Sequence, residues 1–435
     1  MPPKKRSQLQ VKRTQFQNGK IPVRSGVTEK CLFQIEAGQS QPRSPRVAQR
    51  MTEHDQSMMR RALALAKKGE GRVEPNPMVG CVIVRNDRVI GEGYHRYFGG
   101  PHAEIEALRS CTRNPRGATV YVSLEPCCHH GKTSPCADAL IQAGVARVVT
   151  PLRDPNPAVN GRGLRRLRGA GITVTTGVLV HEAAEVLAPF LTRVRLGRPY
   201  VIAKWAQSLD GILVTPPGES KWISCEASRR TVHRLRARVD AVLVGGSTVL
   251  ADDPRLTARH VSLRRRALRV VLDGRLRTPL SAKLVATSKI TPTLVLTTPR
   301  ALNTKKAQQL KRKGVELVVC KTRNGRLVLG DCLSHLSGRG VTNLLVEGGP
   351  TVLHALLKAR LVDEVWAFVA PKLIGGGPQA CSLPNVVAHT DLRAATVERS
   401  GNDHFYRLRL TEPRSGKFEV QSSKKPGLRT SNFAL

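Results

Sequence analysis

The stretches HAEIEAL (residues 102–108) and LEPCCHHGKTSPC (residues 124–136) decide how the first half of this chain is interpreted. They place a His, a Glu and a Cys-rich loop close together, and no similar cluster occurs later in the sequence. Zinc binds His nitrogen and Cys thiolate, and a catalytic zinc keeps three protein ligands with a fourth position open for water. His102, Cys127 and Cys136 supply such a set. We therefore predict one zinc ion bound by these three residues.

Glu104 lies two residues after the predicted His ligand. Zinc lowers the pKa of its bound water from about 15.7 to about 7, which gives a nucleophile at neutral pH. A carboxylate at this position is suited to carry the proton from that water to a departing amine. Cys136 follows Pro135 and opens the segment CADALIQAGV. We expect a helix to begin there, with a dipole that favours the Cys136 thiolate.

Neighbouring residues offer alternatives to these ligands. Cys128 competes with Cys127, but Cys127 is the cysteine that directly follows Glu-Pro, as it does in zinc deaminases. His129 and His130 are also potential metal ligands. We expect both histidines to line the pocket, with one of them near the substrate.

Length and composition limit the possible classes of protein. A chain of 435 residues with 40% hydrophobic residues is long enough for two or three domains. No window approaches eighteen uninterrupted apolar residues, and the basic N-terminus lacks the apolar run of a secretory signal. The ten cysteines are scattered except at the motif above, which argues against a disulfide scaffold. We expect a soluble cytoplasmic protein with no membrane partner.

The charge balance is strongly basic. The chain has 71 Lys and Arg against 32 Asp and Glu, a net charge of +39. Residues 1–50 hold eleven Lys/Arg and two Glu, and residues 413–435 hold five and one, so most of the charge lies between them. Two readings stay open: anionic partners such as nucleic acid or phosphorylated metabolites, and a general arginine bias without a specific partner.

The chain divides into four predicted regions. Residues 1–52 and 413–435 lack apolar periodicity, so we expect disordered basic extensions, and a chain starting at Met51 is expected to fold. From residue 53 to 198, apolar strand-like runs such as MVGCVIV alternate with helical ones such as AEIEALRS. From residue 199 to 412 the alternation restarts with YVIAKWAQSLDG. Each of these two regions therefore predicts an α/β domain.

Two Gly-Gly turns mark the second domain. NLLVEGGPTVLHALLKA reads as a strand, a turn and a helix with Thr351 as N-cap, so backbone N–H groups from Gly349 onward can hold a phosphate. AVLVGGSTVL repeats this pattern at Gly245, Gly246 and Thr248. The G-x-G-x-x-G fingerprint of dinucleotide-binding Rossmann domains is absent.

The first domain shows the H-x-E and P-C pattern of zinc deaminases, with eight residues between the two cysteine ligands in place of two. PNPMVGCVIV, GEGYHRYFGGPHAEIEAL, LEPCCHHGKTSPC and DPNPAVNGRG occur in this order and resemble the pyrimidine deaminase domain of riboflavin biosynthesis. The resemblance implies a cytidine-deaminase-like α/β/α layered domain. It also implies that Asn76 recognises the base, whereas the residues alone also fit ordinary Asn-Pro turn chemistry.

The second domain resembles the reductase half of the same bifunctional family, through KWAQSLDG, ESKWIS, VLVGGSTVLADDPRLTAR and LLVEGGPTVLHALL. The resemblance spans roughly residues 53–412 and implies a dihydrofolate-reductase-like α/β fold with NADPH as hydride donor. The implied cofactor-binding residues are Ala206, Trp222, Thr248, Asp252 and Gly349. The implied substrate-binding residues are Lys204, Ser220, Arg236, Leu256, Arg259 and Glu347.

Together the two resemblances imply a fused enzyme acting on consecutive phosphorylated pyrimidines, with NADPH preferred over NADH and a homo-oligomer possible. Two other classes of protein remain as alternatives. A nucleic-acid-editing deaminase fits the charge, but an aromatic content of 4% is low for stacking single strands. A zinc-stabilised binding module usually has four protein ligands and has no use for Glu104. Salt-dependent RNA binding by the protein would favour the nucleic-acid-editing deaminase. Zinc binding without deaminase activity would favour the binding module.

Overall fold

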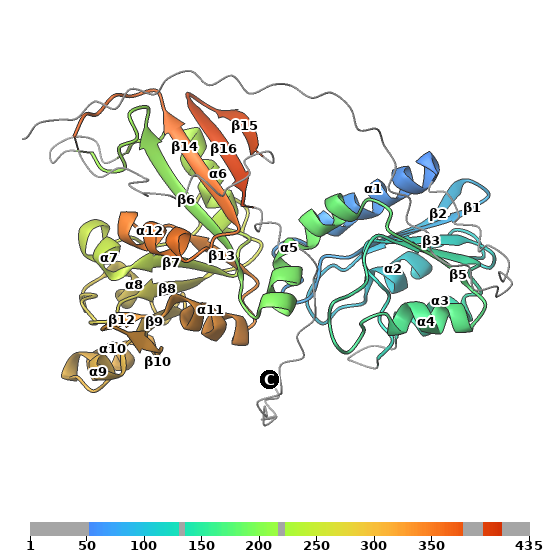
Figure 1. Ribbon diagram of the computed structural model, residues 1–435, viewed down its shortest axis with the longest axis horizontal. Helices are drawn as coiled ribbons and strands as arrows, with labels where there is room; N and C mark the ends of the chain where they lie inside the picture. Colours follow the sequence, from blue (N-terminus) through green and yellow to red (C-terminus); the bar gives the residue numbers. More distant parts are fainter. Residues whose placement is uncertain (1–51, 130–134, 216–221, 377–394, 411–435) are drawn as a thin grey trace, which may run out of the picture. The chain divides into compact units, whose positions relative to one another are not determined.

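The computed structural model describes residues 52–129, 135–215, 222–376 and 395–410. All of these residues belong to one compact unit, Arg50–Leu435. Figure 1 shows two α/β domains in this unit, each built around its own sheet. Residues 1–51 and 413–435 of the predicted extensions, Ser220 and His130 lie outside the described residues. Thr52, the last residue of the first predicted extension, is described and caps the first helix. Within the described ranges, no helix has the length and apolar character that a membrane crossing requires.

The first domain contains a five-stranded sheet in the order β2-β1-β3-β4-β5. Strand β1 pairs antiparallel with β2 and β3, whereas β3, β4 and β5 run parallel. The bounds are β1 (Gly80–Arg85), β2 (Arg88–Tyr94), β3 (Thr119–Val122), β4 (Arg147–Thr150) and β5 (Thr173–Thr176).

Helices cover both faces of this sheet. Cys81 and Ile83 of β1 belong to one core cluster and Val82 and Val84 to another, because successive strand residues point to opposite faces. Helices α2, α3 and α4 contribute to the first cluster, and α1 and α5 to the second. The predicted α/β/α layering is confirmed. The bounds are α1 (Glu53–Lys67), α2 (Ala103–Arg109), α3 (Cys136–Gln142), α4 (Arg162–Gly169) and α5 (Val180–Leu196).

The second domain contains a nine-stranded sheet in the order β10-β9-β8-β7-β13-β6-β14-β16-β15. The first seven strands in this order, from β10 at the edge to β14, run parallel to one another. Strand β16 then pairs antiparallel with β14, and β15 pairs antiparallel with β16. The bounds are β6 (Tyr200–Ser208), β7 (Ala241–Gly245), β8 (Leu268–Leu272), β9 (Thr293–Thr297), β10 (Glu316–Val319), β13 (Asn343–Val346), β14 (Glu364–Ala370), β15 (Ala395–Ser400) and β16 (Asp403–Arg409).

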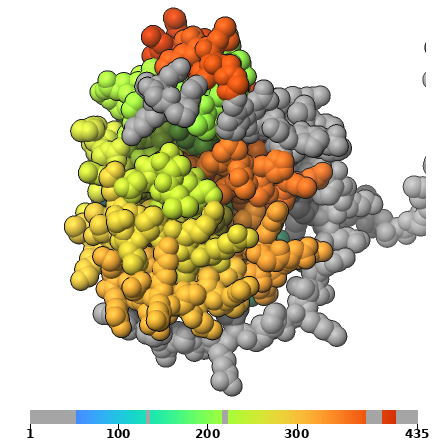
Figure 2. All heavy atoms as spheres, turned by 90° about the vertical axis from the view of Figure 1, so that its left-hand side faces the viewer, coloured from blue at the N-terminus to red at the C-terminus, as the bar shows by residue number. Residues whose placement is uncertain are grey.

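Apolar residues cover both faces of the large sheet as well. Val242 and Val244 of β7 face one core cluster and Leu243 faces the other. A separate two-stranded ladder joins β11 (Thr322–Arg323) and β12 (Arg326–Leu327). Segments of this domain, coloured yellow to orange, form much of the face seen in Figure 2. The helices are α6 (Glu226–Arg236), α7 (Gly246–Asp252), α8 (Lys283–Ala286), α9 (Pro299–Leu302), α10 (Lys305–Arg312), α11 (Leu329–Gly338) and α12 (Pro350–Lys358).

Helix α5 connects the two domains. It packs Phe190 and Leu191 against the first domain and ends at Gly197, whose φ of 65° suits a left-handed cap. Strand β6 then begins at Tyr200. The predicted boundary near residue 198 lies in this short connection.

Candidate active sites

The three predicted zinc ligands lie together. Nδ1 of His102 is 3.2 Å from Sγ of Cys136 and 3.5 Å from Sγ of Cys127. His102 is the N-cap residue of α2, and Cys136 is the first residue of α3. The backbone N–H of Cys136 also donates to Sγ of Cys127 at 3.3 Å. The starts of two helices and the loop after β3 therefore converge on one point.

This group fits a zinc ion. In a tetrahedral site with bonds of about 2.0 to 2.3 Å, neighbouring ligand atoms lie about 3.5 Å apart. The S···N distances observed here, 3.2 and 3.5 Å, match that spacing. Across the described residues, no fourth His, Cys, Asp or Glu side chain joins the group. A three-residue donor set that leaves a coordination position open is typical of catalytic zinc.

Without metal, the two cysteine ligands lie in hydrogen-bond contact with each other. Helix α3 does begin at Cys136. However, the hydrogen bond with Cys127 and burial raise the pKa of Cys136 well above its usual range. The same hydrogen bond lowers the pKa of Cys127.

Glu104 lies in the first turn of α2, next to the three ligands, and only 3% of its surface is exposed. Burial raises the pKa of its carboxyl to about 7, although the neighbouring His102 acts in the opposite direction. A carboxyl with a pKa near neutrality can both accept and release a proton.

His102, Cys127 and Glu104 open onto a cavity of about 260 Å³ that Asn76 and His129 also line. Nδ2 of Asn76 lies 3.1 Å from Nε2 of His95, and Nδ1 of His95 lies 2.9 Å from the carbonyl oxygen of Pro101. Nδ1–H of His95 thus donates to this carbonyl, so Nε2 accepts from the Asn76 amide. The side-chain oxygen of Asn76 remains as an acceptor for a ligand. His95 was not predicted, because a lone His in GYHRYF carries no motif.

Glu125 is a second residue that the sequence analysis missed. It is buried, and its carboxylate accepts from the backbone N–H groups of four residues, Asp154, Gly161, Gly163 and Leu164. These bonds fasten the DPNPAVNGRG segment to the loop that carries Cys127. Asp154 lines the cavity, and burial raises its pKa to about 6. The Glu before Pro-Cys was visible in the sequence, but its partners lie about thirty residues further on.

Cys128 lies outside the metal-ligand group, with its Sγ directed to the carbonyl oxygen of Ala158 at 3.9 Å. The prediction for His130 concerns a residue outside the described ranges.

In the second domain, Lys204, Arg236 and Glu347 come together from β6, the end of α6 and the residue after β13. Arg236 donates from Nε and Nη2 to the two carboxylate oxygens of Glu347, at 2.5 and 2.6 Å. Burial lowers the pKa of Lys204, whereas the charge of Glu347 acts to raise it. Arg236 is therefore not a solvated helix charge, since its guanidinium is buried in an ion pair beside Lys204.

Two other predicted substrate residues lie next to this group. The backbone N–H of Arg259 donates to Nδ1 of His233 at 3.1 Å. Burial and the nearby charges of Arg236 and Arg259 lower the pKa of His233 to about 4, so its ring is a neutral acceptor at pH 7. Leu256 has a φ of 53° and its side chain lies in the core. Only the backbone of Leu256 is available for a substrate contact.

The two Gly-Gly turns approach each other. The N–H of Gly349 donates to Oγ1 of Thr248 at 3.1 Å, which joins the starts of α7 and α12. Gly349 is the N-cap of α12 and Pro350 its first residue, so the prediction of Thr351 as N-cap was wrong by two positions. Proline is favoured at the first position of a helix, which explains the earlier start.

The remaining predicted cofactor residues are spread around these turns. Ala206 lies in β6 and packs partly against the core, and Asp252 is the last residue of α7. Trp222 is half exposed, with the guanidinium of Arg229 4.8 Å from its ring centre. Its backbone carbonyl accepts from Nζ of Lys372 at 3.2 Å.

The structure also forms a second group of metal-binding side chains, which the sequence did not reveal: Cys320, Asp331 and His335. Asp331 already accepts from the backbone N–H of Lys321 at 2.8 Å and lies 3.5 Å from Nε2 of His335. These contacts explain the position of the Asp331 carboxylate without a bound metal.

A zinc-type deaminase site and a separate reductase-like site on one chain define a bifunctional deaminase and reductase. Residues 52–151 match the family "Cytidine and deoxycytidylate deaminase zinc-binding region", and residues 199–406 match "RibD C-terminal domain".

Relatives match nearly their full length. The riboflavin biosynthesis protein RibD of Aquifex aeolicus is 43% identical over 81% of this chain and 97% of that protein. RibD of Escherichia coli is 43% identical over 76% of this chain and 92% of that protein. The Acinetobacter baumannii RibD structure aligns with a TM-score of 0.72 at 38% identity, covering 83% of this chain and 99% of that one. The chain belongs to the RibD family of bifunctional riboflavin-biosynthesis enzymes.

Proposed function

We propose that the first domain hydrolyses the 2-amino group of 2,5-diamino-6-(5-phosphoribosylamino)pyrimidin-4(3H)-one, and that the second reduces the ribosyl chain of the product with NADPH. The final product is 5-amino-6-(5-phosphoribitylamino)uracil. A Thermotoga maritima structure, 37% identical with a TM-score of 0.71, carries both activities in its name, as a diaminohydroxyphosphoribosylaminopyrimidine deaminase and 5-amino-6-(5-phosphoribosylamino)uracil reductase. That name supports the proposed order of reactions.

In the first site, His102, Cys127 and Cys136 hold the zinc ion. A zinc ion held by these residues would supply an activated water molecule for attack on the carbon that bears the amino group. Glu104 takes a proton from this water and delivers one to the departing amine, so water is consumed and ammonia released. Asn76, oriented by His95, accepts a hydrogen bond from the pyrimidine and fixes it in the cavity.

In the second site, NADPH supplies a hydride when bound, and one proton completes the reduction of the opened ribose chain. Thr248 and Gly349 hold the cofactor where α7 and α12 begin. Lys204 and Arg259 bind the phosphorylated substrate, with Ser220 and the backbone of Leu256. Arg236 fixes the Glu347 carboxylate, which orients one edge of the substrate pocket.

The observation that carries the proposal is the placement of Glu104. It is a buried carboxyl beside a three-ligand group and opens onto a cavity that Asn76 also lines. A structural zinc site has no use for this carboxyl, and a binding module has no use for the second domain. Among the described residues that line the cavity, Phe190 is the one aromatic residue apart from histidines, which is too few for stacking the bases of a single strand.

The test is to incubate the protein with the aminated pyrimidine phosphate, with and without NADPH, and to identify the products by mass. Without NADPH we expect replacement of one amino group by oxygen. With NADPH we expect a further gain of two hydrogens. Reduction of the aminated substrate without prior deamination would contradict the proposed order.

A further inference from the structure

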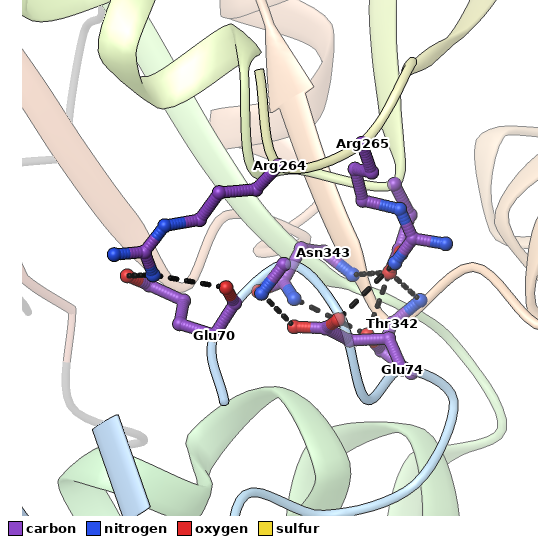
Figure 3. A network of polar contacts seen from close by, with 8 residues as sticks. Glu70, Glu74, Arg264, Arg265, Thr342 and Asn343 are labelled. Atoms are coloured by element: carbon purple, nitrogen blue, oxygen red, sulfur yellow. Dashed lines mark hydrogen bonds and ion pairs between the residues drawn. The ribbon is translucent and has the colours of Figure 1, made fainter. Parts of the chain in front are cut away.

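The loop between α1 and β1 touches both domains. Its residues Pro75, Asn76 and Pro77 line the deaminase cavity. Glu74, directly before them, is 7% exposed and points the other way, toward the reductase domain, as Figure 3 shows. The same short segment therefore forms a wall of one domain's cavity and a contact with the other domain.

Arg265 of the reductase domain holds this loop. Its Nη1 donates to Oε2 of Glu74 at 3.2 Å (Figure 3). The same Nη1 also donates to Oδ1 of Asp240. The other carboxylate oxygen of Glu74 accepts from the backbone N–H of Gly71 at 2.9 Å. A continuous chain of polar contacts thus runs from the reductase sheet through Arg265 into the loop that carries Asn76.

The reductase end of this chain is firmly anchored. Oδ2 of Asp240 accepts from the N–H and the hydroxyl of Thr342 at 2.7 and 2.6 Å, and from the N–H of Asn343 at 2.8 Å. Asp240 precedes β7, and Asn343 begins β13. Because Asp240 has these three other donors, its position does not depend on Arg265.

Close backbone packing seats the same loop. Gly71 has a φ of 76°, and a Cβ there would lie 3.0 Å from Cα of Arg238. Nη1 of Arg264 donates to the carbonyl oxygen of Glu70 at 3.0 Å, and Arg238 forms an ion pair with the Glu70 carboxylate at 3.3 Å. The loop therefore packs against the reductase domain, where Arg265 binds Glu74, two residues before Asn76, and Gly340 lies beside Pro75.

The charges make Arg265 important to Glu74. Burial, together with the negative charge of Asp240, raises the pKa of Glu74 to about 7. Arg265 is the cation that offsets two buried carboxylates. Without it Glu74 faces Asp240 with no counter-ion, which favours protonation of Glu74 or movement of the loop.

We propose that Arg265 is a positioning residue for deamination: the reductase domain, through Arg265 and Glu74, holds the loop that presents Asn76 to the pyrimidine. This inference rests on the proposed deaminase function. It means that a residue of the other domain holds one wall of the deaminase cavity in place.

The contact leaves the reductase site untouched. Asp240, Thr342 and Asn343 lie where β7 and β13 begin, whereas Gly245 and Glu347 lie where these parallel strands end. At about 3.3 Å per residue, Thr342 and Glu347 are about 16 Å apart along the chain. A change at Arg265 is therefore separable from the reductase reaction.

The test uses full-length Arg265→Ala, Arg265→Lys and, as a control, Arg266→Ala. Arg266 is in the same segment, but its Nη1 donates to the carbonyl oxygen of Ile290 at 2.6 Å, away from the loop. For Arg265→Ala we expect the KM for deamination to rise about tenfold, the scale of one lost charge-assisted hydrogen bond, with a smaller change in kcat. Arg265→Lys should recover part of this loss, and Arg266→Ala should match the parent.

Reduction of the pre-deaminated substrate by Arg265→Ala should stay within about twofold of the parent, because the contact lies far from that site. An unchanged KM for deamination in Arg265→Ala would overturn the inference. So would an equal fall in both half-reactions. If the parent protein does not deaminate at all, it is the proposed function that fails.

A double-mutant cycle separates positioning from general destabilisation. Glu74→Gln keeps the shape of the side chain and its acceptor for Gly71 but removes the charge that Arg265 holds. If the two residues act as a pair, Arg265→Ala should add less than about twofold to the KM in the Glu74→Gln background. Fully additive effects would refute the pairing. If Arg265→Ala does not fold, the same double-mutant cycle can be measured with Arg265→Lys in place of Arg265→Ala, in combination with Glu74→Gln.

Discussion

Replacing Glu104 by Gln should strongly slow deamination and leave both the metal and the reductase intact. Glu104 is almost fully buried in the first turn of α2, so an isosteric amide fits the same space without creating a cavity. The ligand atoms belong to His102, Cys127 and Cys136, and none of them is altered. Only the capacity to accept and release a proton is lost.

The size of the loss follows from that single role. Proton transfer by a positioned side chain contributes a factor of about 10² to 10⁴ to a rate. We therefore expect the kcat for deamination to fall at least about a hundredfold, or about 2.7 kcal/mol in activation free energy at 25 °C. The reductase residues all lie beyond residue 198, so the variant given pre-deaminated substrate should oxidise NADPH at close to the parent rate.

The assay combines metal content by mass spectrometry with separate measurements of the two half-reactions. A Glu104→Gln protein that deaminates normally would show that the proton is carried by another group. A protein whose reductase rate falls in step with its deaminase rate would show that the second site depends on the first. A protein that loses its zinc would show that Glu104 supports the metal.

Three further predictions concern metal, cofactor and stability. Cys136→Ser should lower the zinc content and the melting temperature, because metal binding is coupled to folding; full zinc occupancy would count against the ligand assignment. NADPH should give a higher kcat/KM than NADH in the reductase assay, and equal values would contradict the predicted preference. Asp55 is buried in a bidentate pair with Arg147, so Asp55→Asn should lower the free energy of unfolding at pH 7 by about 3 kcal/mol in urea titrations. Burial acts to raise the pKa of Asp55, but hydrogen bonds from Arg147, Tyr121 and Thr52 outweigh it and lower the pKa. The difference in unfolding free energy between the parent and Asp55→Asn should thus be complete above pH 3.8, the ordinary pKa of Asp. It should shrink as the pH falls through the lowered pKa of Asp55 in the folded protein. A difference that persists below that lowered pKa would refute this account.

The zinc group and Glu104 could be predicted from the sequence because short local patterns carry them. His102 and Glu104 are two residues apart on one helix turn, and each Cys ligand lies next to a proline that marks its loop. The order of strands and helices was also predictable, since apolar runs alternate with amphipathic ones in both domains. These features depend on neighbours in the chain.

What the sequence did not reveal depends on partners far apart in the chain. Arg236 and Glu347 were each expected at the reductase site, but their ion pair joins residues 111 positions apart. His95 and Glu125 act by orienting other residues; His95 carries no motif, and the Glu-Pro-Cys motif does not show which residues Glu125 binds. Such contacts are set by the packing of whole elements.

Part of the basic charge also has a structural explanation. Arg269 is fully buried, and its guanidinium donates to the carbonyl oxygens of Leu284 and Thr291 and to the hydroxyl of Thr287. Arg147 likewise serves inside the protein, in its pair with Asp55. These two arginines are not available to an anionic partner, although they are only two of the 71 Lys and Arg residues.

The two halves of the chain depend on each other unequally. The reductase group at Lys204 and Glu347 lies at the ends of parallel strands, where ligand sites in such sheets usually form, and the first domain contributes nothing to it among the contacts described. The deaminase cavity, in contrast, has one wall formed by a loop that Arg265 holds from the other domain. Loss of Glu104 should therefore spare the reductase, whereas a change at Arg265 in the reductase domain should impair the deaminase. Fusion of the two domains then serves the first reaction structurally, in addition to keeping consecutive enzymes on one chain.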